Sequence, residues 1–192
     1  MISRIKEFLL KIKFEIAFLF SKPAYTPKIF CIGYNKTGTT TIGKSLEILG
    51  YRNSSFNQKV WREYYKKGDI DSLINYTSKF ESFDDLPWLL ADIFPIMDER
   101  FPNSKFIYLE REAEAWKRSF YNWAYKHNGE YPDMEKSFNS YQDHKSFVLD
   151  YFKDRKDDLL ILNVTDPEAF FKLGEFIGRK APSKQLPHFN KA

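Results

Sequence analysis

The sequence has few of the residues from which common reactive centres are built. Cys31 is its one cysteine, so an internal disulfide and a cysteine-based metal cluster are both excluded. The three histidines, His127, His144 and His188, are widely separated and show no spacing typical of metal ligands. There is also no G-x-S-x-G segment, the turn that presents a nucleophilic serine in many hydrolases. Zinc hydrolysis and serine-triad chemistry therefore have no support, and no metal is expected.

Runs of charge of one sign are also lacking. The 30 lysines and arginines are dispersed among 26 aspartates and glutamates, which leaves a net charge of +4. Without a basic stripe, nucleic-acid binding is not expected, whereas a small positive excess suits a protein that handles anionic nucleotides. With 192 residues, of which 43% are hydrophobic, the chain is long enough for one domain with its own core.

No hydrophobic run is long enough to cross a bilayer comfortably. The most apolar segment, residues 8–20, is interrupted by charges and is followed by no small-residue cleavage site. We expect residues 1–24 to form an amphipathic helix that packs on the domain or, with Arg4 and Lys6 at its start, lies at a membrane surface. Residues 25–192 would form the domain. The expected location is cytoplasmic, with or without membrane association.

A glycine-bounded loop follows the first predicted strand, residues 28–32. The glycines let the backbone curl so that its N–H groups converge, and the next helix would direct its positive end at the same place. The loop also carries a lysine and a cluster of hydroxyl groups. This combination predicts a phosphate-binding loop. Its sequence is Gly33-Tyr34-Asn35-Lys36-Thr37-Gly38-Thr39-Thr40-Thr41.

A second register of the loop implies a different enzyme. Residues 38–45 match the ATPase pattern G-x-x-x-x-G-K-[ST], with Lys44 placed for the β/γ-phosphates and Ser45 for magnesium. This register starts well after the strand and leaves few helical residues before the stop at Gly50. We favour the loop that starts directly after the strand, because it leaves a longer helix, residues 39–49, with an apolar face.

A second strand followed by a helix carries another phosphate-binding pair. The strand, residues 104–111, ends in Arg111, and the helix predicted over residues 112–126 carries Ser119. Ser119 lies about two helical turns beyond the strand end, so an extended arginine and this hydroxyl can reach one phosphate group. By themselves, the two residues would equally suit a solvated charge and a helix-surface hydroxyl.

Together these segments resemble the sulfotransferases that use 3′-phosphoadenosine-5′-phosphosulfate (PAPS). Their signature loop reads approximately Pro-Lys-Ser-Gly-Thr-Thr, which residues 35–40 follow with asparagine first, and they pair an arginine with a serine as here. The Asp-x-Pro at residues 85–87, the turn and strand at 101–107 and the tail at 186–190 resemble a compact carbohydrate/other branch of the family. The Gly-x-x-Gly-x-Trp-Lys segment and the catalytic histidine of the cytosolic aryl and steroid enzymes are absent.

The resemblance implies transfer of a sulfuryl group from PAPS to an acceptor hydroxyl, without a metal. Lys36 would be the electrostatic catalyst, the threonines would bind the 5′-phosphate, and the arginine and serine would hold the 3′-phosphate. The acceptor expected from the aromatic content and the missing histidine is a glycan or glycolipid. The donor-binding residues implied are Lys36, Thr37, Gly38, Thr39, Thr40, Thr41, Arg111 and Ser119.

The acceptor hydroxyl also needs a base, and a carboxylate is the natural substitute for histidine. Asp85 is the first candidate and Asp84 the second, although aspartate before Leu86-Pro87 would equally suit helix capping. Glu47 and Glu110 are weaker alternatives.

Two other functions stay open. One is a magnesium-dependent kinase or ATPase that uses Lys44 and Ser45, with Asp166 recruited for the metal. The other is a nucleotide-binding module without catalysis. The sequence does not predict the oligomeric state.

The alternation of strands and helices predicts an α/β fold, a single-domain three-layer P-loop fold with a largely parallel central sheet flanked by helices. A further strand is expected at residues 158–164, a short one at 51–55, and a closing helix at 168–178. Residues 82–87 have the character of a helix entry. Residues 128–145 are polar and contain Gly129 and Pro132, so they are expected to form a surface insertion.

Overall fold

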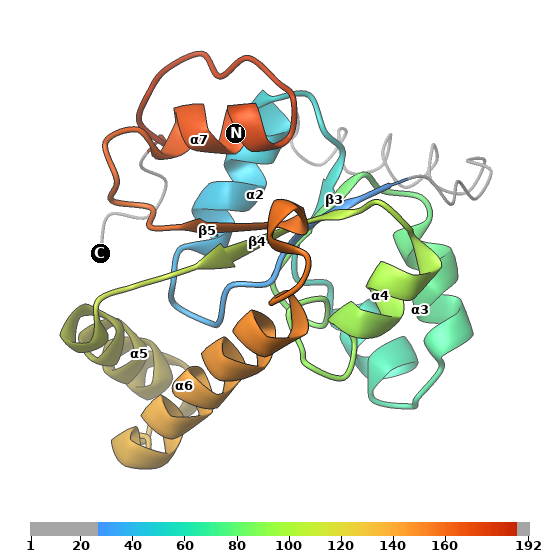
Figure 1. The fold of residues 1–192 in the computed structure, drawn as a ribbon. Coiled ribbons are helices and arrows are strands. Elements are labelled where there is room, and N and C mark those ends of the chain that lie inside the picture. The colour runs from blue at the N-terminus through green and yellow to red at the C-terminus, as the bar shows by residue number, and fades with distance from the viewer. Residues whose placement is uncertain (1–26, 188–192) are drawn as a thin grey trace, which may run out of the picture.

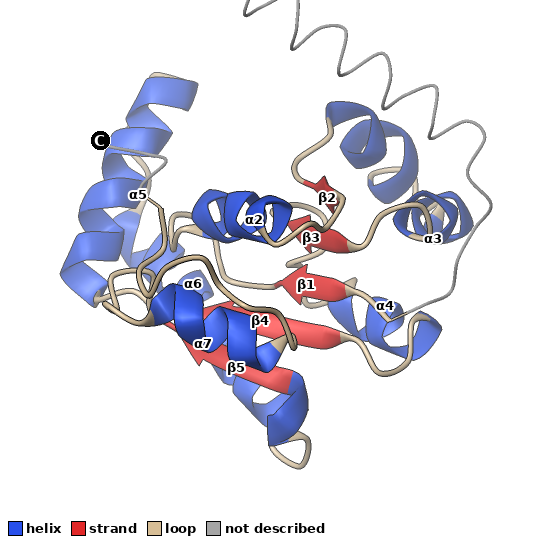
Figure 2. Cartoon of the chain, turned by 90° about the horizontal axis from the view of Figure 1, so that it is seen from above, coloured by secondary structure: helices blue, strands red, loops and turns tan. Residues whose placement is uncertain are grey.

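The computed structural model describes residues 27–187, which form a five-stranded parallel sheet covered by helices (Figures 1 and 2). The strands are β1 (Ile29–Cys31), β2 (Asn53–Ser54), β3 (Ser82–Asp84), β4 (Lys105–Leu109) and β5 (Leu159–Leu162). The helices are α2 (Thr39–Ile48), α3 (Ile70–Thr77), α4 (Phe94–Arg100), α5 (Ala113–Asn128), α6 (Met134–Tyr151) and α7 (Ala169–Phe176), with one turn of π-helix, η1 (Val60–Tyr65), and one of 3-10 helix, η2 (Lys156–Asp158).

The predicted three-layer α/β fold is confirmed by the two cores on either side of the sheet. Side chains alternate along β1, so that Phe30 faces one core and Cys31 the other, and β4 does the same with Phe106 and Ile107. The first core also contains residues of α3, α4 and α6, and the second contains residues of α2 and α7. In Figure 1, α2 and α7 lie above the strands and α6 lies below them.

The strand order places a ligand-binding edge beside β1. The sheet runs β2-β3-β1-β4-β5, so the chain fills one side of β1 first and then crosses to the other side. β1 pairs in parallel with both β3 and β4. In open parallel sheets of this kind, ligands bind outside the carboxyl ends of the strands where the order reverses. The loops that leave β1, β3, β4 and β5 all emerge at that edge.

The prediction for residues 82–87 was wrong, because they begin with β3, an interior strand of the sheet, and not with a helix. β3 pairs with β1 on one side and β2 on the other. Two of its three residues are polar, and they are satisfied by hydrogen bonds to β2 and to the residue that follows it: Ser82 donates to Asn53, and Asp84 accepts from Asn53 and Ser55. A strand stabilised in this way lacks the apolar run that would identify it.

The prediction of a surface insertion at residues 128–145 was also wrong, because α6 occupies most of this segment. Gly129 ends α5 with a left-handed backbone (φ 72°), and the Asp133 side chain caps α6 by accepting from the Lys136 N–H. Gly129 and Pro132 therefore mark a short turn between α5 and α6. α6 looks polar because it buries few residues, among them Tyr141 and His144.

The N-terminal helix expected at residues 1–24 lies outside the described residues. Among residues 27–187, no helix is long and apolar enough to span a bilayer.

Candidate functional site

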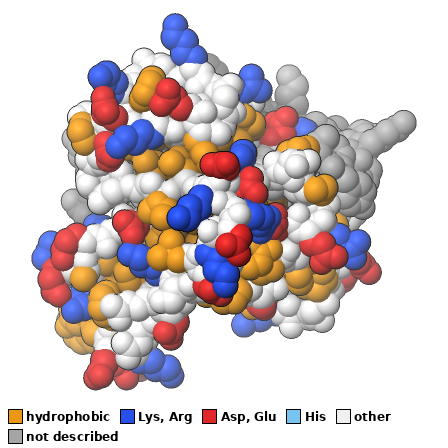
Figure 3. Space-filling model, viewed as in Figure 1, with side chains coloured by type: hydrophobic (Ala, Val, Ile, Leu, Met, Phe, Trp, Pro, Cys, Tyr) orange, Lys and Arg blue, Asp and Glu red, His pale blue; other side chains and the backbone are white. Residues whose placement is uncertain are grey.

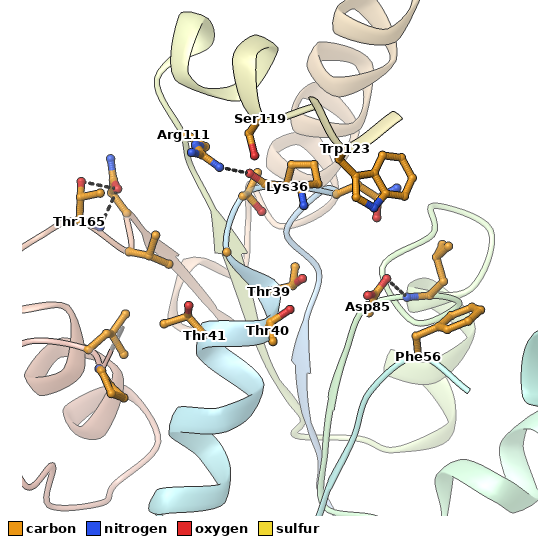
Figure 4. Close-up of a pocket in the computed structure, with 18 of the residues that line it drawn as sticks. Lys36, Thr39, Thr40, Thr41, Phe56, Asp85, Arg111, Ser119, Trp123 and Thr165 are labelled. Atoms are coloured by element: carbon orange, nitrogen blue, oxygen red, sulfur yellow. Dashed lines mark hydrogen bonds between the residues drawn. The ribbon is translucent and has the colours of Figure 1, made fainter. Parts of the chain in front are cut away.

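A pocket of about 740 Å³ lies at the carboxyl ends of the strands. The loops after β1, β3, β4 and β5 all contribute to its wall, together with one face of α5 (Figure 4). It brings together each of the donor-binding residues implied by the sequence and the first candidate base. The lining residues are Asn35, Lys36, Thr37, Gly38, Thr39, Thr40, Thr41, Phe56, Asp85, Leu86, Arg111, Ser119, Trp123, His127, Asn163, Val164, Thr165, Leu186 and Pro187.

The loop after β1 delivers an open helix end to this pocket. Lys36 and Gly38 both have left-handed backbones, with φ of 69° and 109°. Gly38 is the N-cap of α2, no side chain caps this end, and the first turn contains no acidic residue. The first N–H groups of a helix have no intrahelical acceptor and carry the positive end of its dipole. The start of α2 is therefore suited to an anion.

The carbonyl groups of the same loop are held by side chains. The Asn35 carbonyl accepts from Trp116 Nε1 at 2.8 Å, and the Lys36 carbonyl accepts from Arg111 Nη1 at 2.6 Å. The buried Thr37 hydroxyl donates to the Tyr34 carbonyl at 2.6 Å, so this threonine supports the loop from within. These bonds fix the orientation of consecutive peptide groups.

Arg111 and Ser119 lie on the far side of the loop from Asp85. Figure 4 shows the Ser119 hydroxyl beside Arg111 and above Lys36. Arg111 leaves β4 and reaches the loop, while Ser119 comes from α5, as the helical spacing required. The two segments that the sequence linked through one nucleotide therefore line one pocket.

Lys36 is the lysine that projects into the pocket. Its ammonium lies 5.8 Å from the centre of the Trp123 ring, and it forms no ion pair with any residue of the described range 27–187. Burial lowers the pKa of Lys36, and the nearby Arg111 charge lowers it further, while Asp85 opposes both effects. Such a partly desolvated cation acts strongly on negative charge brought next to it.

The neighbouring acids Asp84 and Asp85 have different surroundings. Asp85 lines the pocket, has a left-handed backbone (φ 75°) and accepts from the Leu86 N–H at 2.7 Å, and burial raises its pKa. Asp84 is 1% exposed, bonds to β2 and does not line the pocket, and burial raises its pKa to about 6. The pocket therefore has Asp85 as its acid, and the helix-capping interpretation of that residue does not apply, because a loop follows it.

The weaker acid candidates are paired on the surface. Glu47 binds Lys44 at 2.8 Å, and Glu110 binds Lys145 at 2.5 Å. Neither residue lines the pocket.

The ATPase register is not the one that the chain adopts. Residues 39–48 are helical, so Lys44 and Ser45 lie inside α2 and not in a loop. The Ser45 hydroxyl donates to the Thr41 carbonyl at 2.7 Å, and Asp166 pairs with Lys172 at 2.5 Å. Lys44, Ser45 and Asp166 do not line the pocket.

Several pocket residues were not identified from the sequence. Trp123 and His127 follow Ser119 at intervals of one helical turn, so the α5 stripe that they share was visible as a periodicity. Phe56 and the residues after β5 carried no such signal. They reach the pocket because β2 and β5 run parallel to the other strands, so that their carboxyl ends lie on the same side of the sheet.

Comparison with known families agrees with this geometry. A family model described as a sulfotransferase domain matches residues 28–134. The match covers more than half of the chain, and the chain belongs to this sulfotransferase family. It includes the loop after β1, Asp85, Arg111 and Ser119, and it ends at the start of α6. A search of curated proteins found no match.

The surface around these elements has mixed charge. On the face shown in Figure 3, basic and acidic side chains are interspersed and do not form a patch of one sign.

Proposed function

We propose that this sulfotransferase uses PAPS as its donor and transfers the sulfuryl group to a hydroxyl of a carbohydrate or glycolipid. The observation that carries the proposal is the shared pocket of the β1–α2 loop and the Arg111–Ser119 pair. The first group suits the 5′-phosphosulfate of the donor, and the second suits its 3′-phosphate. The 3′-phosphate is the feature that separates PAPS from other adenine nucleotides.

The donor side of the pocket consists of Lys36, the start of α2, Arg111 and Ser119. Backbone N–H groups and threonine hydroxyls at the start of α2 would bind the 5′-phosphate, and the guanidinium with the Ser119 hydroxyl would bind the 3′-phosphate. The pocket volume of about 740 Å³ lies within the range of roughly 300–1,000 Å³ that is usual for ligand sites.

The reaction forms a bond between the acceptor oxygen and sulfur and breaks the bond between sulfur and the bridging oxygen of the 5′-phosphate. Lys36 would stabilise the negative charge that develops on the departing phosphate, as preorganised cations do in phosphoryl transfer. Asp85 would accept the proton of the acceptor hydroxyl. The products are the sulfated acceptor and adenosine 3′,5′-bisphosphate.

The acceptor side of the pocket consists of Phe56, Asp85, Leu86, Trp123 and His127. Phe56 is 49% exposed and, with Trp123, flanks the position of Asp85 in Figure 4. Aromatic faces beside a carboxylate suit a sugar ring, which offers apolar C–H faces and hydroxyl groups. This arrangement supports the carbohydrate or glycolipid acceptor.

Ligand-induced stabilisation tests the donor. Adenosine 3′,5′-bisphosphate at a hundred times its dissociation constant should stabilise the protein by about 2.7 kcal/mol, which raises the melting temperature by roughly 5–10 °C. ATP with magnesium should stabilise it much less, because it has no 3′-phosphate for Arg111 and Ser119. A larger shift with ATP and magnesium would contradict the proposal.

Mass spectrometry of glycans and glycolipids incubated with PAPS tests the transfer. A mass increase of one sulfuryl group that requires both enzyme and donor is the expected result. Binding of the bisphosphate without modification of any acceptor would favour a nucleotide-binding module.

A further inference from the structure

The donor loop contacts a helix that lies beyond the family match. α6 begins where the matched residues end, yet its side chain His144 reaches the strand that leads into the loop. His144 Nε2 lies 2.7 Å from the Ile32 carbonyl oxygen. Because a carbonyl oxygen only accepts, Nε2 carries the hydrogen and donates it. A bond between residues so distant in sequence fixes the exit of β1 relative to α6.

The surroundings of His144 hold the imidazole in this role. The residue is 7% exposed, and its ring lies 5.3 Å from that of Tyr34 and 6.1 Å from that of Tyr108. Burial lowers the pKa of His144 and so favours the neutral ring. If the loop moved away, the buried N–H of His144 would lose its hydrogen-bond partner, which costs free energy. The bond therefore favours the loop conformation in which it forms.

A second side chain of α6, Tyr141, contacts Arg111, which with Ser119 would bind the 3′-phosphate. The Tyr141 hydroxyl lies 3.3 Å from both the backbone nitrogen and the backbone oxygen of Arg111. Its ring stacks on Trp116 at 4.9 Å, and Trp116 holds the Asn35 carbonyl. α6 therefore supports the residue that would bind the 3′-phosphate as well as the loop that would bind the 5′-phosphate.

We propose that His144 and Tyr141 are positioning residues of the donor site: His144 sets the loop after β1 through the Ile32 carbonyl, and Tyr141 sets Arg111 through its backbone. The inference rests on the proposed function, because it assigns α6 to the same donor pocket. It makes α6 part of the nucleotide site, although neither residue lines the pocket.

The test titrates adenosine 3′,5′-bisphosphate and adenosine 5′-phosphate into the wild-type protein and matched variants by calorimetry. His144→Phe keeps a ring and removes the donor, so it should weaken both nucleotides about tenfold, or ~1.4 kcal/mol. His144→Gln keeps an N–H at a similar reach and should stay within about threefold of the wild type. Tyr141→Phe should weaken the bisphosphate about threefold and leave the 5′-phosphate unchanged.

Val148→Ala is the control for a general loss of packing, because Val148 is a buried residue of α6 one turn further along, in the apolar core. It should bind both nucleotides as the wild type does. The inference is overturned if His144→Phe binds both nucleotides normally, if His144→Gln loses as much as His144→Phe, or if Val148→Ala loses as much.

If His144→Phe does not fold, Tyr141→Phe is the deciding variant. An equal loss of affinity for the two nucleotides, or no loss of affinity for either, would overturn the inference. A wild-type protein that binds neither nucleotide overturns the proposed function, whereas a binding wild type with unaffected variants overturns only the role of α6.

Discussion

On the donor side of the pocket, consecutive carbonyl groups accept from Trp116 and Arg111, and the loop between a buried strand and α2 is fixed at both ends. On the acceptor side, Phe56 is half exposed, and the other residues come from the loop after β3 and from α5. The donor side thus presents one defined arrangement of N–H groups and cations, and the acceptor side presents a general aromatic surface. The class of reaction is therefore better defined by this molecule than the identity of its acceptor.

The largest effect expected from breaking the donor side is that of Lys36→Ala. Removing the cation that would face the departing phosphate in the proposed reaction should lower kcat by about 10²–10³-fold, as loss of one preorganised stabilising group does. Steady-state kinetics with PAPS measures the change. The matched control is Lys44→Ala, which removes a lysine exposed on α2 and paired with Glu47. Normal turnover in Lys36→Ala, or an equal loss in Lys44→Ala, would show that the loop register is wrong.

On the acceptor side, Asp85→Asn should have the next largest effect. Loss of the base should lower kcat by roughly 10²-fold or more while binding of adenosine 3′,5′-bisphosphate stays within about twofold. Kinetics and calorimetry on the same preparation separate the two quantities. Asp84→Asn is the control. Asp84 is buried against β2 outside the pocket, so its replacement should leave kcat unchanged. Wild-type kcat in Asp85→Asn would remove this residue from the mechanism.

The pH dependence of kcat/KM compares the two sides directly. Burial raises the pKa of Asp85, so activity should increase with pH through a value above the ordinary 3.8, where the base becomes ionised. Burial lowers the pKa of Lys36, so activity should fall again at a pH below the ordinary 10.5, where the cation is lost. A profile measured between pH 4 and pH 10 checks both limbs. A profile without the acidic limb would argue against a carboxylate base.

Ser119→Ala should have a smaller effect, confined to the 3′-phosphate. Loss of one hydrogen bond to a charged group should weaken adenosine 3′,5′-bisphosphate about tenfold and leave adenosine 5′-phosphate unchanged. Calorimetric titration with both nucleotides measures the difference. Ser137→Ala on α6 is a suitable control, because that exposed hydroxyl bonds only to the Asp133 carbonyl among its described contacts. Equal weakening of both nucleotides by Ser119→Ala would place the 3′-phosphate elsewhere.

Asp84 should affect stability and not catalysis. Its pKa is raised from 3.8 to about 6, so between these pH values the folded state binds the proton more tightly than the unfolded state does. The free energy of unfolding should therefore fall by about 3 kcal/mol as pH rises through this window. Below pH 3.8 the carboxyl is protonated in both states, and Asp84 causes no further change with pH. Urea unfolding of wild type and Asp84→Asn from pH 3.5 to pH 7 isolates the contribution. A constant difference between the two proteins would show that Asp84 is not buried as described.

The sequence predicted the parts of the fold that depend on neighbouring residues. The strand at residues 28–32, the loop with Lys36 and the helix from Thr39 were recognisable because apolar runs, glycine and helical spacing act over a few residues. β3 was missed because its polar residues are satisfied by another strand, and the first part of α6, up to residue 145, was missed because few of its side chains face the core. Both depend on partners far along the chain.

The sequence by itself determined the glycine-bounded loop after β1, the spacing of Arg111 and Ser119 and the α/β class, because each follows from local patterns of residues. The tertiary structure alone decided which of two adjacent aspartates faces the pocket, and that Phe56 and His127 join it. It also decided that His144 holds the exit of β1. These outcomes depend on how separate segments pack, and packing is settled only when the whole core is buried.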